Sequence, residues 1–364
     1  MIAPLRGPAF GSYACDEVGW LLTDLSAVPL EASPDHRERA IQAGTAHYAE
    51  SLPVEYRPTD EYVALFRRAL ADTADRLAHD VGVLTELVRH LVSPRPVLLS
   101  LARAGTPIAV LMRRWALATT GIDLPHYAVS IVRGRGIDTA ALRWVLDRHD
   151  AADLVFVDGW TGKGAIAREL TAALADFPVR PTLAVLTDPG SCTDVYGSRD
   201  DYLVPSACLN STVSGLVSRT VLNRLLLRPG EFHGAKFYAD LTDADLSTVF
   251  LDTVSARFAS VMAAVARDWP ELAAADRTPR WTGWPAVQRI GAEYHISDLN
   301  LVKPGVGETT RVLLRRVPWR VLIRAGAGRD VEHVRLLAAD RGVPVEEHSD
   351  LPYQCVGLIR PLNR

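Results

Sequence analysis

The sequence predicts an α/β protein in which a parallel sheet carries a helical N-terminal cap and is followed by a small C-terminal α/β domain. From residue 96 onward, short apolar runs alternate with amphipathic segments. The long segment before them has apolar residues at a helical period, as one buried helix face requires. A second strand–helix pattern fills the last part of the chain, after a stretch rich in proline and tryptophan.

The chain of 364 residues is long enough for more than one folded unit. We expect a helical cap region, a main α/β domain, a linker and a small α/β domain, over residues 1–95, 96–266, 267–299 and 300–364. The net charge of −3 indicates no overall attraction to nucleic acid or membranes. No apolar run is long enough to span a bilayer, and the N-terminus lacks the pattern of a secretory signal.

The four cysteines, Cys15, Cys192, Cys208 and Cys355, are scattered along the chain without a CxxC pair or a zinc-ligand spacing. We therefore expect reduced thiols and a cytoplasmic location.

In the cap region we expect a short helix starting near Asp16, a second helix over residues 36–50 and a long third helix. Thr59 would cap the third helix, and Asp60 and Glu61 in its first turn favour a helix start. Its apolar positions continue at a helical period to Leu91.

The first strand, residues 97–101, leads into a loop of small residues around one arginine: Ala102, Arg103, Ala104, Gly105 and Thr106. Pro107 suits the first turn of the following helix. Backbone N–H groups at such a strand-to-helix turn can bind phosphate. An ordinary turn is the alternative.

The next strand, residues 127–132, opens into a cationic segment in which Arg133 and Arg135 lie between glycines. The arginine fork can grip phosphate in two places, so this segment suits a mobile loop over an anion. A solvated basic turn is the alternative. We favour the functional interpretation because the segment lies between two other anion-type loops.

The central strand, residues 154–157, ends at Asp158 and leads into a second glycine-rich loop. The candidate phosphate-binding residues there are Thr161, Gly162, Lys163, Gly164 and Ala165. Lys163 is one of only three lysines in the chain, which makes its place in this loop informative. Asp158 could hold a ribose hydroxyl or Mg²⁺. A strand-to-helix turn in which glycine and threonine serve only geometry is the alternative.

Further strands are expected at residues 182–186 and 202–205, and the second of them leads into a hydroxyl-rich segment that becomes helical. Ser206, Asn210, Ser211 and Thr212 could contact an acceptor molecule or could cap that helix. Residues 300–364 contain 11 Lys and Arg against 7 Asp and Glu, a net charge of +4. The rest of the chain is therefore −7, and a basic small domain suggests a contact with nucleic acid or phosphate.

Several long runs carry a family resemblance: LARAGTPI, SIVRGRGID, FVDGWTGKGAI, LNSTVSGLVSRT, FHGAKFY and VKPGVGETTRVLLRR. They resemble a bacterial family found in tellurite-resistance and stress operons. Its N-terminal domain is classed as phosphoribosyltransferase-like and its C-terminal domain as Pelota-type RNA-binding, and it also carries the label cysteine protease StiP. The last run is similar to the helix start of kink-turn RNA binders. This similarity implies an RNA contact through Lys303, Gly305, Gly307, Glu308, Thr309 and Arg311.

The resemblance implies a type I phosphoribosyltransferase-like sheet and a reaction that uses phosphoribosyl diphosphate (PRPP) with Mg²⁺. Ribose 5-phosphate would pass to a base or another small acceptor, or the reaction would run in reverse. The 5-phosphate would lie at residues 161–165 and the pyrophosphate at residues 102–106. Arg133 or Arg135 would close over the pyrophosphate while Asp158 holds the ribose and the metal. A homodimer is compatible with this scheme.

Two other classes of function stay open. One is a thiol hydrolase of the cysteine-protease type, with Cys208 as nucleophile and His233 or His47 as base. The other is a non-catalytic, RNA-associated protein whose sheet senses a nucleotide.

Overall fold

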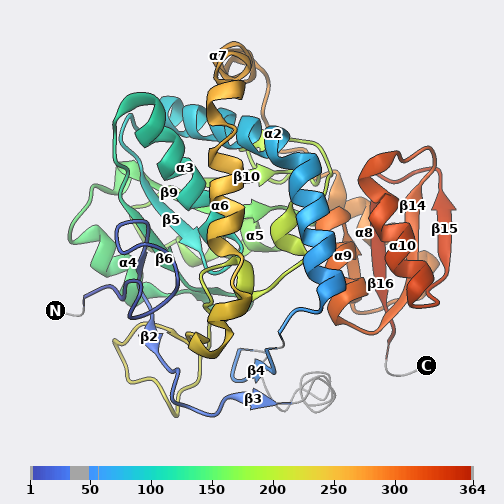
Figure 1. The fold of residues 1–364 in the computed structure, drawn as a ribbon, viewed down its shortest axis with the longest axis horizontal. Coiled ribbons are helices and arrows are strands. Elements are labelled where there is room, and N and C mark those ends of the chain that lie inside the picture. Colours follow the sequence, from blue (N-terminus) through green and yellow to red (C-terminus); the bar gives the residue numbers. More distant parts are fainter. Residues whose placement is uncertain (1–2, 33–48, 56, 362–364) are drawn as a thin grey trace.

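A six-stranded sheet forms the centre of the protein, seen here in a computed structural model that describes residues 3–32, 49–55 and 57–361 (Figure 1). Its strands, in spatial order, are β1 (Gly19–Trp20), β6 (His126–Val129), β5 (Val97–Leu101), β9 (Leu154–Trp160), β10 (Leu183–Thr187) and β11 (Val195–Ser198). All neighbouring pairs are parallel, which confirms the expected parallel sheet. The strand order reverses between β5 and β9, and ligands bind beside such a reversal in open α/β sheets.

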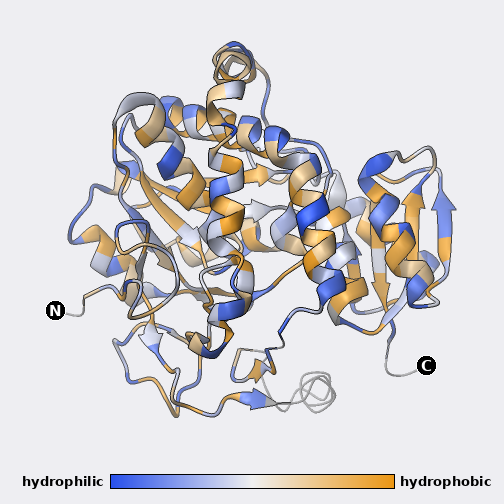
Figure 2. Cartoon of the chain, in the orientation of Figure 1, coloured by the Kyte–Doolittle hydropathy of each residue, from blue (hydrophilic) through white to orange (hydrophobic). Residues whose placement is uncertain are grey.

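Helices cover both faces of the sheet because its central strands are apolar on both sides. Leu98 and Val155 pack into the core on one face, and Leu99 and Phe156 pack into the core on the other. The first face is covered by α2 (Asp60–Leu91), α3 (Gly105–Thr120), α6 (Ser247–Ser255) and α7 (Phe258–Ala274). The second is covered by α4 (Thr139–Leu146) and α5 (Ala165–Ala173). Figure 2 shows the apolar residues concentrated on the strands and the inward helix faces.

The start of the chain differs from the expected helices. The long helix is present as α2, but residues around Asp16 form turns and then the short strands β1 and β2 (Thr23–Asp24). Trp20 is fully buried, and Gly19 pairs with Tyr127, so this segment extends the sheet edge instead of coiling. The second expected helix lies largely outside the described residues, between β3 (Glu31–Ala32) and β4 (Leu52–Pro53).

The segment after β10 also differs from the expected strand and helix. The strand lies at Val195–Ser198 and not at residues 202–205, and the following residues form two single turns, η2 (Pro205–Ala207) and η3 (Ser211–Val213). They do not form a helix because their backbone groups bond elsewhere in the chain. Ser218 N donates to Lys236 O at 2.9 Å, next to β12 (Gly234–Ala235), which pairs with β2.

The arginine segment after β6 is a small antiparallel hairpin, β7 (Ile131–Val132) and β8 (Gly136–Ile137), in keeping with its glycine spacing. Further along, the expected linker contains the end of α7 and all of α8 (Gly283–Glu293). Val287 and Ile290 of α8 pack into the core of the C-terminal sheet.

The small C-terminal α/β domain is confirmed. Its sheet has the order β13 (Val302–Pro304), β16 (Cys355–Ile359), β14 (Pro318–Arg324) and β15 (Val345–His348). Helices α9 (Val306–Arg315) and α10 (Glu332–Asp340) pack against it. Val306 and Leu313 of α9 belong to the same hydrophobic cluster as the main domain, so the two units share a packed interface.

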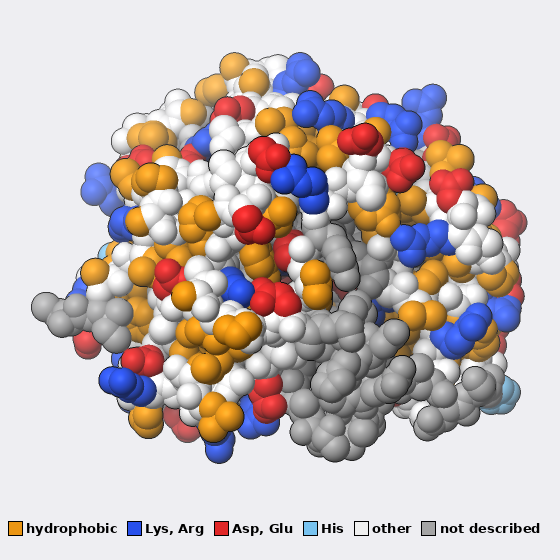
Figure 3. Space-filling view, turned by 60° about the horizontal axis from the view of Figure 1, so that its bottom comes forward, with side chains coloured by type: hydrophobic (Ala, Val, Ile, Leu, Met, Phe, Trp, Pro, Cys, Tyr) orange, Lys and Arg blue, Asp and Glu red, His pale blue; other side chains and the backbone are white. Residues whose placement is uncertain are grey.

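Within the described residues no single helix has the length and apolar character to cross a membrane, whereas α6 and α7 taken together do, with a bend of 63° between them. On the face shown in Figure 3, basic and acidic side chains are interspersed.

Candidate functional site

The three loops identified in the sequence meet at the carboxyl edge of the sheet. Ala104 from the loop after β5, Arg133 from the hairpin and Asp158 from the end of β9 line one cavity of about 320 Å³. The β9 loop supplies a continuous part of the remaining wall, from Thr161 to Ala165. Arg135 is exposed and is not part of the lining.

Several polar groups of the β9 loop already have protein partners. The Thr161 hydroxyl donates to the Asp188 carboxylate, and the Lys163 ammonium donates to the carbonyls of Leu299 and Val302. The Gly162 carbonyl accepts a 3.1 Å hydrogen bond from the Tyr353 hydroxyl. These contacts hold the loop against the rest of the protein.

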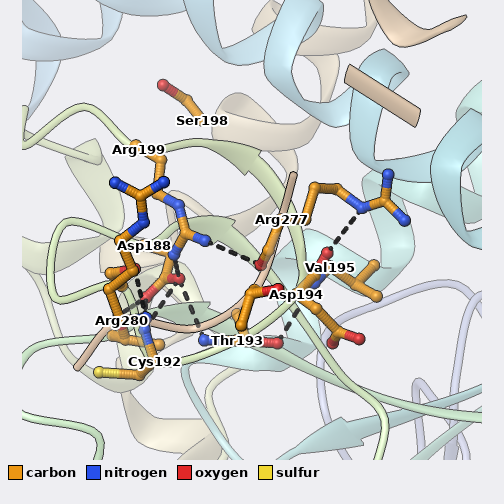
Figure 4. Close-up of polar contacts among 12 residues, drawn as sticks. Asp188, Cys192, Thr193, Asp194, Val195, Ser198, Arg199, Arg277 and Arg280 are labelled. Carbon is orange, nitrogen blue, oxygen red and sulfur yellow. Dashed lines mark hydrogen bonds and ion pairs between the residues drawn. The ribbon is translucent and has the colours of Figure 1, made fainter. Parts of the chain in front are cut away.

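Asp188, which directly follows β10, holds this loop in place through Thr161 (Figure 4 shows its other contacts). Its fully buried carboxylate forms an ion pair with Arg199 and accepts hydrogen bonds from the backbone N–H groups of Cys192, at 2.9 and 3.0 Å, and Thr193, at 3.1 Å. A buried carboxylate needs such partners, and together with Thr161 they fix the turn after β10 against the turn after β9.

Asp158, the expected ribose and metal ligand, is largely surrounded by protein. Burial raises the pKa of its carboxyl to about 6, and one oxygen accepts the Gly159 backbone N–H at 2.8 Å. The described residues contain no group of three or more His, Cys, Asp or Glu side chains arranged to hold a metal ion. Mg²⁺ at Asp158 therefore stays a prediction.

The start of α9 closes the cavity from the C-terminal side. Lys303, Glu308 and Arg311 line it, and the Arg311 guanidinium lies 4.5 Å from the centre of the Trp160 ring. The Asp201 carboxylate of the main domain accepts the backbone N–H groups of Val306 and Gln354, each at 2.8 Å.

The residues of the expected RNA contact thus face the main domain. Gly305 lies beside Asp201, Gly307 beside Trp160, and Thr309 is fully buried. The RNA contact itself stays a prediction.

A second polar cluster surrounds residues 205–214, here called the Cys208 segment. Arg103 donates from its guanidinium to the side-chain oxygen of Asn210 at 2.8 Å. Glu55 accepts from both the backbone N–H of Ser211 at 3.0 Å and its hydroxyl at 2.7 Å. The Ser206 hydroxyl is buried and has no hydrogen-bond partner within the described chain. Thr212 is buried, and its carbonyl accepts the Leu246 N–H.

Cys208 itself is 1% exposed and begins the turn after η2, where its N–H donates to the Pro205 carbonyl at 2.9 Å. Burial alone would suit a thiol that only fills space in the core. A purely apolar core would not need charged groups beside it. Here the Arg103 guanidinium is bound to Asn210 and the Glu55 carboxylate to Ser211, two and three residues after Cys208.

Two other cysteines are in surroundings that oppose a thiolate. Burial and the neighbouring Asp188 charge raise the pKa of the Cys192 thiol to about 12. Burial raises the pKa of Cys355, in strand β16, well above its usual range. Cys15 is exposed in the N-terminal turns. A nucleophilic cysteine needs the opposite, a site that favours the ionised sulfur.

Of the two candidate bases, only His233 lies within the described residues. His233 belongs to a separate cluster, where its Nδ1 is 2.8 Å from the Ser130 hydroxyl and its backbone N–H donates to Asp138. Burial lowers the pKa of His233. His47 lies outside the described residues.

Comparison with known proteins shows to which family the chain belongs. The family described as "Tellurite-like stress resistance cysteine protease StiP" matches residues 11–255. The chain belongs to the StiP family. The family described as "PELOTA RNA binding domain" matches residues 281–361, which include α8 and the small sheet. A protein of Acinetobacter baylyi named "Cysteine protease StiP" is 35% identical over 371 residues, covering 97% of this chain and 95% of the relative.

The StiP match confirms the resemblance to a tellurite-resistance and stress family with a Pelota domain. It overturns the phosphoribosyltransferase prediction, because the family and the relative are both named as cysteine proteases. The predictions of PRPP-dependent ribosyl transfer and of the transferase class are therefore wrong. The geometry offers a physical reason: Thr161 and Arg103, expected to hold the two phosphate groups, are bonded to Asp188 and Asn210 instead.

Sequence reasoning missed the residues that fix these contacts, namely Glu55, Trp160, Asp188 and Asp201. Asp188 had a visible signal, since it follows the apolar strand of β10 as Asp158 follows the strand of β9. Asp201 and Glu55 had none, because each acts on a segment about 100 or more residues away.

Proposed function

We propose that this StiP-family protein is a cysteine peptidase and that Cys208 is its nucleophile. The observation that carries the proposal is the polar cluster around the Cys208 segment, where the Arg103 guanidinium is fixed by Asn210. Asn210 is two residues after Cys208, and a cation that acts on the thiol would favour the thiolate that peptide hydrolysis requires. The Acinetobacter relative, which is named a cysteine protease, supports the same chemistry.

The chemistry would follow the usual two stages. The Cys208 thiol passes its proton to an imidazole, the sulfur forms a bond to the peptide carbonyl carbon, and the electron pair of the C=O bond moves to its oxygen. The C–N bond then breaks and the amine leaves with a proton from an imidazolium. Water next attacks the thioester, its proton passes to the imidazole, and the carboxylic acid and the thiol are released.

Three side chains in or bonded to the Cys208 segment can stabilise the negative oxygen of that intermediate. The guanidinium of Arg103 and the amide N–H of Asn210 are donors already fixed by their mutual contact. The Ser206 hydroxyl is a buried donor with no hydrogen-bond partner in the described chain, so it can donate to a substrate oxygen. Fixed donors of this kind contribute much of the rate of acyl transfer.

The base is assigned by exclusion among the two sequence candidates. His233 is held at Ser130 and Asp138 by two hydrogen bonds, which leaves His47 as the histidine to test. Because Cys208 is 1% exposed, a substrate reaches the sulfur only after the atoms around it move. We therefore expect slow basal turnover that rises when the cover is displaced.

Alkylation with site mapping tests the assignment. Iodoacetamide should abolish peptide hydrolysis in step with the adduct on Cys208, whether or not the exposed Cys15 is also modified, and His47→Ala should slow both processes. Cys192 and Cys355 should stay unmodified in the native protein, because their raised pKa values leave almost no thiolate. Loss of activity that follows an adduct on Cys15 instead would reject Cys208.

A further inference from the structure

We propose that a pocket at the start of β14 binds the C-terminal end of an extended peptide and holds its carboxylate with two arginines. The pocket belongs to the small domain, where residues 318–319, residues 341–344 and Arg360 line a volume of about 350 Å³. It contains no residue of the Cys208 segment or of the cavity at the β9 loop, and it does not depend on the proposed peptidase activity.

The first residues of β14 have an open backbone edge at this pocket. β15 is the edge strand of the small sheet (Figure 1), and its pairing with β14 begins only at Val321, opposite Val345. On the other side, the pairing with β16 shifts register between Pro318 and Arg320, so Trp319 has no partner residue in either strand. A bulge of this kind leaves its extra residue unpaired. The open edge can therefore pair with an added strand, which is a common way to bind an extended peptide.

The opposite wall of the pocket is the turn that joins α10 to β15. Gly342, with a left-handed φ of 62°, follows the helix, and the Val343 N–H bonds back to the Ala338 carbonyl at 2.8 Å. Such a bond, together with a glycine in this conformation, is typical of a helix end at which the chain changes direction. The turn places Arg341 and Val343 on the pocket wall, so that a cation and an apolar side chain lie near the open edge of β14.

The pocket is positively charged, and none of its lining residues is acidic. The Arg360 guanidinium is exposed and makes no hydrogen bond or ion pair with a residue that the structure describes. Arg341 bonds through Nη2 to the Tyr62 hydroxyl at 2.7 Å and to the Leu314 carbonyl at 3.4 Å, which leaves its Nε and Nη1 for a ligand. Two arginines without a carboxylate partner in the described chain suit a carboxylate, which can accept two N–H groups from one guanidinium.

The size of the pocket favours the end of a peptide over a long segment. A volume of about 350 Å³ lies near the lower end for ligand pockets. Trp319 and Val343 offer contacts to an apolar last side chain, and Val317 beside the pocket is 61% exposed. RNA is held by repeated phosphate contacts, for which two cations in one pocket are few. We therefore expect a free carboxylate that follows an apolar last residue.

Affinity selection with the immobilised full-length protein tests the site. The probe is a pool of short peptides randomised at their last positions, offered once with free carboxylates and once amidated. Mass spectrometry identifies the retained peptides. We expect retention of free-acid peptides that end in an apolar residue. Amidation of a selected peptide should weaken its binding roughly 10-fold or more in calorimetric titration, because the charge that the arginines hold is lost.

Variants locate the binding. Arg360→Met should weaken binding of the selected peptide roughly 10-fold, and Arg341→Met is the second pocket variant should Arg360→Met fail to fold. The matched control is Arg329→Met. Arg329 is an exposed arginine of the same domain, beyond the other end of β14, and it too has no carboxylate partner among the residues described. This control should bind as the wild type does.

No retained peptide, equal retention of the free-acid and amidated pools, or equal weakening in the Arg360 and Arg329 variants would overturn the proposal. So would a single-stranded RNA oligonucleotide that binds with the same Arg360 dependence while no peptide is retained. Cys208→Ala should select the same peptides as the wild type. Loss of selection in that variant would place the peptides at the Cys208 segment instead, so the outcome is separate from that of the peptidase proposal.

Discussion

The guanidinium of Arg103 donates a 2.8 Å hydrogen bond to the side-chain oxygen of Asn210, across 107 positions of sequence. The contact joins the loop after β5 to the Cys208 segment. In the proposed peptidase, the loop whose sequence suggests pyrophosphate binding would instead form one wall of the thiol site. The same arginine would then serve a different chemistry from the one its loop pattern indicates.

Asn210→Ala should lower kcat/KM for peptide hydrolysis by roughly 10-fold, because Arg103 loses the partner that fixes it near the substrate carbonyl. It should also lower the free energy of unfolding by about 1–3 kcal/mol, since a buried charged donor is left unpaired. Steady-state kinetics and urea unfolding measure the two effects. Asn223→Ala, which removes contacts to Glu50 and Leu225, should reduce stability alone. Equal loss of activity in both variants would contradict a positioning role for Asn210.

Asp201→Ala should loosen the C-terminal domain, because one carboxylate accepts two backbone N–H groups across the interface, at Val306 and Gln354. We expect a loss of about 3 kcal/mol in the free energy of unfolding, as for strong hydrogen bonds to a charged acceptor. The neighbour Asp200, 67% exposed and paired with Arg76, is the control, and Asp200→Ala should cost less than about 1 kcal/mol. Similar urea midpoints for the two variants would show that Asp201 does not hold the domains together.

Gly164→Ala should destabilise the protein more than Gly121→Ala. Both glycines have a left-handed φ, 72° and 69°, so both variants suffer the same backbone penalty, about 1 kcal/mol. An added Cβ at Gly164 would lie 2.3 Å from the Trp281 ring, whereas at Gly121 it would meet open space. Overpacking should add roughly 1–3 kcal/mol at Gly164 alone. Thermal unfolding of the two variants measures the difference, and equal melting temperatures would mean that Trp281 moves aside freely.

Asp158 should make the fold less stable as pH rises. Burial raises its pKa from the usual 3.8 to about 6, so between these values the folded state holds a proton that the unfolded state has lost. Its contribution to stability is thus fully present below pH 4 and is lost as pH rises through 6. Asp158→Asn cannot ionise, so its stability relative to the wild type should increase from pH 5 to pH 7.5 in urea unfolding. A constant difference would mean that this carboxyl titrates normally.

Elements with a strong internal pattern could be predicted from sequence. The apolar runs of β5 and β9 and the helical period of α2 each fix an element without help from the rest of the chain. The meeting of the three loops followed from the geometry of a parallel sheet.

The Cys208 segment could not be predicted in the same way, because long-range contacts determine its conformation. Ser211 bonds to Glu55, and just beyond the segment Ser218 bonds to Lys236, whereas local sequence favours a capped helix there. The predicted function, phosphoribosyl transfer, was wrong for a related reason. A glycine-rich turn looks the same whether its hydroxyl is free for phosphate or, as with Thr161, held by Asp188.

Hydrolysis of a peptide library by the purified protein, read by mass spectrometry of new N-termini, is the most direct test of Cys208 as a peptidase nucleophile. The wild type and Cys192→Ala should generate the same cleavage products, and Cys208→Ala should generate none while it unfolds at an unchanged urea concentration. Cleavage that persists in Cys208→Ala, or that disappears in Cys192→Ala, would contradict the account.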